Sequence, residues 1–101
     1  MFFSITDIVG SRCLTKEQGQ LVFDVIHGPL NDGVVVTIDF LGVQQFAHPF
    51  FRQSIGQLLR DFPHRNLRNQ LHIIGLPKYA VPALEAVIDQ CVYIQEGDDA
   101  T

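Results

Sequence analysis

The feature that most constrains the fold is an uninterrupted run at residues 34–40, with the sequence VVVTIDF. Side chains branched at Cβ favour extended backbone, and an apolar run of this length is typical of a strand in the middle of a sheet. Side chains alternate along a strand, so the even-numbered residues face one way and the odd-numbered ones, including Thr37 and Asp39, face the other. Because this second face carries polar groups, we expect one face of the sheet to be thinly covered.

Helical signals lie on both sides of this strand. Thr15 and Gln18 have the spacing of a capping box, which predicts a helix that begins there and ends at the Gly and Pro of residues 27–29. Pro49 suits the first turn of a second helix, whose apolar stripe continues to Phe62 before Pro63 ends it.

Weaker patterns complete the order β-α-β-α-β-α-β. They predict strands at 2–9 and 71–76, a polar connection at 64–69, a helix at 81–90, a last short strand at 92–94 and a frayed acidic tail at 96–101. This alternation predicts an α/β fold: a four-stranded, mixed but mostly parallel sheet with about three helices. The 101 residues are expected to form a single domain, because two cores of about 50 residues would each be marginal.

Composition narrows the function classes. The chain has 47% hydrophobic residues and a net charge of −4, from 7 Lys and Arg against 11 Asp and Glu, which argues against nucleic-acid binding. It has no apolar stretch long enough for a membrane span and no basic segment typical of a signal peptide, so a cytoplasmic location is expected. Cys13 and Cys91 lie far apart in sequence, and buried thiols are favoured over a disulfide or a metal pair.

Two groups of residues are candidates for binding. Asp39 ends the main strand and His48 begins the following helix, so together they could hold a nucleotide or another small anion, although Asp39 could instead accept backbone donors from its own loop. A basic stretch could receive an acidic protein surface or a phosphate, or simply be a solvated face: Arg52, Arg60, Arg65 and Arg68. No phosphate loop, nucleophile elbow or metal-ligand spacing is present, so no enzyme activity and no cofactor are expected.

Three stretches resemble the STAS-like family of small bacterial domains, which is related to the fold of sulfate transporters and anti-sigma factor antagonists. They are residues 10–19, residues 36–43 and residues 46–59. The resemblance implies a mixed sheet flanked by helices, a non-enzymatic role and protein partners. In the anti-sigma factor antagonists, a Ser just before the second helix is phosphorylated by a kinase of the histidine-kinase-type ATPase class. Here residues 47–50 read AHPF and contain no Ser or Thr.

The sequence therefore predicts a regulatory protein-interaction module, active in partner switching or signalling, that lacks the usual phosphorylated Ser. Its partner could be a histidine-kinase-type ATPase, and pairing into a homodimer is compatible with a thinly covered sheet. We expect docking through the loop before the second helix and the exposed side of that helix: Gln44, Gln45, His48, Pro49, Arg52, Gln53 and Gly56. The alternative is a small-ligand or nucleotide sensor with its site at Asp39 and His48.

Overall fold

The computed structural model describes the backbone of residues 1–100 and the side chains of residues 1–63 and 65–90. Its elements in chain order are β1 (Phe2–Ser4), α1 (Ile5–Val9), β2 (Arg12–Cys13), α2 (Lys16–Asn31), β3 (Val36–Asp39), β4 (Gln45–Phe46), α3 (His48–Asp61), α4 (His64–Gln70), β5 (Leu71–Ile74), the 3-10 helix η1 (Lys78–Ala80) and α5 (Val81–Ala100).

The main sheet has three parallel strands in the order β1-β3-β5, so β3 is central, as its sequence predicts. The prediction of four strands in one sheet is wrong. The short strands β2 and β4 pair in parallel as a separate two-stranded sheet, and residues 92–94 belong to α5. No Gly or Pro lies between residues 83 and 96 to stop that helix, which also includes residues 96–100, where a frayed tail was expected.

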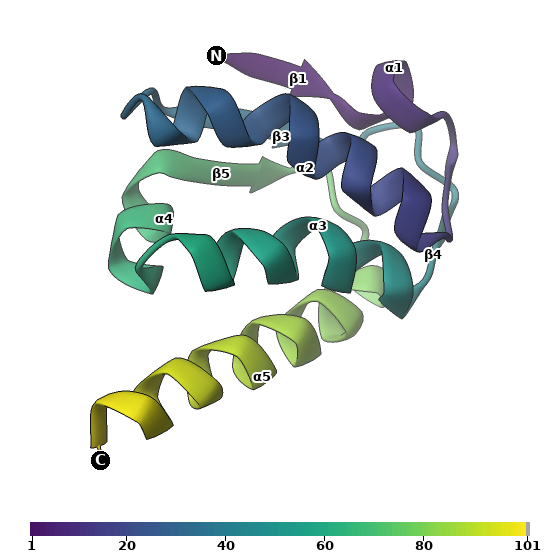
Figure 1. The fold of residues 1–101 in the computed structure, drawn as a ribbon. Coiled ribbons are helices and arrows are strands. Elements are labelled where there is room, and N and C mark those ends of the chain that lie inside the picture. Colours follow the sequence, from purple (N-terminus) through teal and green to yellow (C-terminus); the bar gives the residue numbers. More distant parts are fainter. Residues whose placement is uncertain (101) are drawn as a thin grey trace.

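The helices gather on one face of the sheet. α2 and α3 lie side by side over the strands, and α5 packs against α3 on the side away from α2 (Figure 1). The apolar stripes of the helices meet the even-numbered side chains of β3 in one core. The largest fully buried side chains of that core are those of Ile5, Val22, Ile26, Leu30, Val36, Ile38, Phe40, Phe50, Phe51, Leu58 and Val87, with Cys13.

The described residues leave the opposite face of the sheet uncovered. Strand register places Phe2, Thr37 and His72 side by side on it, and Ser4, Asp39 and Ile74 form the next row. Phe2 and Ile74 keep 60% and 45% of their surface exposed. This face carries the Thr and Asp of the main strand, so the expectation of a thinly covered face is confirmed.

The start of α2 is as predicted, but its end is not. Thr15 Oγ1 accepts the Gln18 N–H at 3.2 Å, and Gln18 Oε1 accepts the Thr15 N–H at 3.0 Å, which completes the capping box. The helix continues past Pro29 and closes where Gly33 (φ 82°) donates to the Leu30 carbonyl and Val34 to that of Pro29. This extra turn buries Leu30, which offsets the hydrogen bond lost at Pro29.

Two other segments predicted as strand or loop are helical. Residues 5–9, expected to continue the first strand, form α1. Residues 64–69, expected to be a polar connection, belong to α4. In α4 the single apolar residue Leu67 is buried and fixes the short helix on the core. α3 begins and ends within one residue of the predicted positions because its Pro signals are local.

Candidate functional site

The loop between β3 and α3 is held by backbone hydrogen bonds to the segment around β2. Gln44 N–H donates to the Ser11 carbonyl at 2.7 Å, and Ala47 N–H donates to that of Cys13 at 2.9 Å. Earlier in the loop, Gly42 has a φ of 92° and Val43 donates back to the Phe40 carbonyl at 3.0 Å. These hydrogen bonds hold the backbone of the loop in one conformation.

Aromatic side chains fix the same loop from the other side. The ring of Phe46 stacks on that of Phe51 with centroids 5.7 Å apart, and Tyr79 meets Phe46 edge-on at 6.0 Å. The Tyr79 hydroxyl donates to the Gln44 carbonyl at 2.8 Å. Sequence analysis missed Tyr79, because no local signal relates it to a residue 35 positions earlier.

Five of the predicted docking residues lie at this junction. Gln44, Gln45, Pro49 and Arg52 are exposed and His48 is half-buried. We call these five residues the junction surface. No other part of the described chain covers its exposed members, so they are accessible to a partner.

The remaining two predicted docking residues are not on an exposed side of α3. Gln53 is half-buried and faces α2, where its Nε2 donates to Gln20 Oε1 at 2.8 Å. Gly56 is buried, so its prediction as an exposed residue is wrong. α3 packs against α2 and also against α5, and its buried arc is therefore wider than its apolar stripe.

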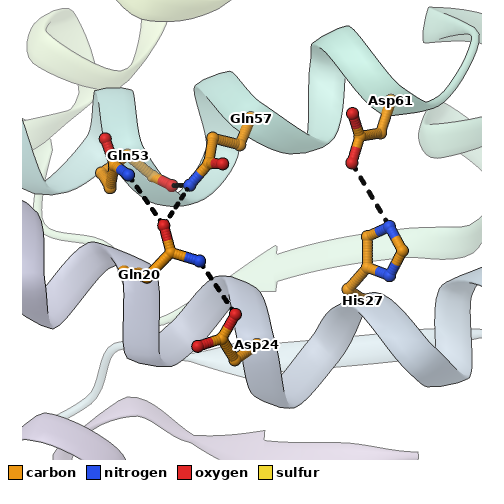
Figure 2. Close-up of polar contacts among 6 residues, drawn as sticks. All are labelled: Gln20, Asp24, His27, Gln53, Gln57 and Asp61. Carbon is orange, nitrogen blue, oxygen red and sulfur yellow. Dashed lines mark hydrogen bonds and ion pairs between the residues drawn. The ribbon is translucent and has the colours of Figure 1, made fainter.

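The polar seam between α2 and α3 explains the position of Gln53 (Figure 2). Gln20 Oε1 also accepts from Gln57 Nε2 at 2.8 Å, while Gln20 Nε2 donates to Asp24. Farther along the two helices, His27 Nε2 lies 3.3 Å from Asp61 Oδ2. These side chains join the two helices to each other, which makes the seam structural.

Asp39 has a structural role at the end of β3. Its Oδ1 accepts the Leu41 N–H at 2.9 Å, the loop-capping role that its position in the sequence allowed. Gly75 (φ 73°) approaches so closely that an added Cβ would collide with this carboxylate. No hydrogen bond or ion pair joins Asp39 to His48 among the described side chains. The small-ligand site predicted for these two residues stays a prediction.

The thiol of Cys13 is buried beneath the loop. Burial raises the pKa of this thiol to about 12, so it is neutral at physiological pH and a poor nucleophile. This agrees with the buried thiol predicted for Cys13, whereas the side chain of Cys91 lies outside the described residues. Within the described residues, no group of three His, Cys, Asp or Glu side chains could bind a metal ion.

None of the helices in the described part of the chain combines the length and the apolar composition needed to cross a bilayer.

Comparison with known proteins gives one result. A family model described as a STAS-like domain of unknown function (DUF4325) matches residues 18–79, which include most of α2, the central strand, the junction surface and Tyr79. No curated protein and no solved structure gives a significant match.

Proposed function

The chain belongs to the family of STAS-like domains of unknown function, and from this premise we propose that it is a non-enzymatic protein–protein interaction module. Its role is regulatory, in partner switching or signalling, and its partner docks on the junction surface. The observation that carries the proposal is the exposure of Gln44, Gln45, Pro49 and Arg52 on a loop whose backbone is fixed by β2 and Tyr79.

A fixed loop favours binding because fewer conformations are lost when a partner arrives. Two more exposed side chains adjoin the junction surface along the chain or through hydrogen bonds. Leu41 begins the loop with 73% of its surface exposed, and Tyr79, 66% exposed, is bonded to the Gln44 carbonyl. Tyr and Arg are enriched in protein interfaces, since they combine apolar area with hydrogen-bond donors.

Charge indicates the kind of partner. Residues 40–60 contain no Asp or Glu, although the whole chain has 11, and they carry Arg52 and Arg60. A partner with acidic side chains opposite Arg52 would gain from this local excess of positive charge. A kinase of the histidine-kinase-type ATPase class is one candidate, by analogy with the anti-sigma factor antagonists.

Serine phosphorylation at the start of α3 is not part of this proposal. The first hydroxyl group of α3 belongs to Ser54, which is buried and donates to the Phe50 carbonyl at 2.8 Å. Because that hydroxyl is inaccessible, docking would be controlled by some means other than a phosphate at this helix end.

The test compares two charge reversals on the same helix. Arg52→Glu lies on the junction surface, whereas Arg60→Glu is an exposed control in the last turn of α3. Partners captured from the source cells are identified by mass spectrometry, and each is then purified and titrated against the wild type and both variants. We expect Arg52→Glu to weaken binding at least tenfold and Arg60→Glu to leave it nearly unchanged, with equal thermal stability for all three proteins. Equal binding by Arg52→Glu, or no specific partner, would refute the proposal.

A further inference from the structure

A cavity of about 150 Å³ lies among α3, α4, β5 and α5. These four elements come together toward the end of α3 that is far from β4 (Figure 1). Most of the lining of the cavity is aliphatic: Ile55, Leu59, Leu67, Leu71, Ile73 and Ile88. The remaining lining residue is Arg68 of α4. This cavity shares no residue with the proposed docking site, and the inference below does not rest on that site.

The aliphatic walls make water a poor occupant. The cavity is partly open to solvent, and Arg68 is the one residue with a polar side chain among those that line it, so water inside it has few polar partners. An apolar cavity of about 150 Å³ is large enough for one benzene ring. It is too small for a nucleotide, since pockets for drug-sized ligands measure roughly 300–1,000 Å³.

Arg68 is the charged residue in the lining of the cavity. Its side chain is exposed, and no carboxylate among the described side chains forms an ion pair with it. The ion pair found among those side chains joins His27 to Asp61. Arg68 therefore supplies an unpaired, exposed positive charge beside an apolar space, and a guanidinium binds a carboxylate with two parallel hydrogen bonds. Arg65, one turn earlier on α4, adds positive charge to the same short helix.

We propose that this cavity binds a small apolar carboxylate of about the size of benzoate. The ring or branched alkyl group fills the space between α3, β5 and α5, and the carboxylate lies against Arg68. Apolar contact supplies affinity, and the charged pair selects an acid over a neutral or cationic compound of the same shape.

The experiment uses the whole chain, labelled with ¹³C at its Ile and Leu methyl groups, and follows their NMR signals. Benzoate is titrated against its neutral isostere benzamide and the cation benzylammonium, each to about 20 mM at pH 7. We expect saturable shifts at Leu59, Ile73 and Ile88 with benzoate, and affinity at least tenfold lower for the other two probes.

Two variants and a control assign the binding to this site. Arg68→Gln should abolish the preference for benzoate over benzamide, whereas Arg65→Gln should keep it. Ile88→Phe should fill the cavity and prevent binding while the protein remains folded, as judged by circular dichroism. Equal affinity for benzoate and benzamide in the wild type, an unchanged preference in Arg68→Gln, or shifts that do not saturate would each overturn the proposal.

Discussion

Replacing Gly19 with Ala should weaken the packing of α2 on α3, although Ala is the better helix former. Gly19 is buried where α2 lies in close contact with α3. A Cβ added there would lie 2.5 Å from the Phe50 carbonyl oxygen, 2.9 Å from Gln53 Cβ and 3.2 Å from the Ser54 nitrogen. Two of these atoms belong to the backbone of α3, so rotating a side chain cannot relieve the contact.

The size of the effect follows from two opposing terms. Ordinary contact begins at about 3.4 Å, so the helices must separate by about 1 Å at this point. Overpacking of this kind costs about 2–3 kcal/mol, and the higher helix propensity of Ala returns about 1 kcal/mol. We therefore expect Gly19→Ala to lower the free energy of unfolding by about 1–2 kcal/mol.

Urea denaturation followed by circular dichroism measures this change. With a slope of about 2 kcal/mol per molar urea, the midpoint should fall by roughly 0.5–1 M. Gly28→Ala in the same helix is the control, since its Cβ would meet nothing within 4 Å outside its chain neighbours. The following Pro29 limits its gain, so we expect a midpoint at or slightly above that of the wild type. A midpoint for Gly19→Ala equal to or above the wild-type value would show that the helices are not in this close contact.

Three further predictions test other local features. Thr15→Ala removes the capping box and should cost about 1 kcal/mol in thermal denaturation, whereas Thr15→Ser should retain most of it. The pKa of the Cys13 thiol is about 9 in the unfolded chain and is raised to about 12 in the folded protein. Between these pH values only the unfolded chain loses the proton, so the free energy of unfolding falls as the pH rises. By pH 10 the loss should be about 1.4 kcal/mol, and Cys13→Ala should lack it when urea midpoints at pH 7 and pH 10 are compared. Gly75→Ala combines positive-φ strain with a collision against Asp39, whereas Gly10→Ala has the strain and no contact within 4 Å. Gly75→Ala should therefore lower the melting temperature more than Gly10→Ala does. Equal losses would contradict the close approach of Gly75 to Asp39.

The parts of the fold that sequence predicts well are those whose signals are local. The capping box of α2 and the flanking prolines of α3 each act within one helical turn, and the apolar run of β3 identifies a central strand by itself. The exposure of Gln44, Gln45, Pro49 and Arg52 also follows from local signals, because these residues lie in one loop and one helix turn. Local patterns of this kind predict where an element begins, because they depend only on residues within that element or beside it.

Long-range packing decides what sequence could not predict. Gly56 looked exposed because it lies off the apolar stripe of α3, and only the presence of helices on two sides of α3 accounts for its burial. Tyr79 belongs to the candidate site through a bond to Gln44, and its own neighbours in sequence give no indication of it. The cavity beside Arg68 is similar, since its walls come from four elements.

Residues 5–9 show most clearly how the sheet overrides local preference. Four of these five residues are β-branched, so by propensity the segment should continue the first strand: Ile5, Thr6, Ile8 and Val9. Register pairs Ser4 with Asp39, the last residue of β3, so a longer β1 would extend past the end of its partner strand. Its backbone groups would then lack partners in the sheet, whereas a turn of helix satisfies them internally and buries Ile5 in the core. The end of the central strand thus determines where β1 ends, although the two positions lie more than 30 residues apart in the chain.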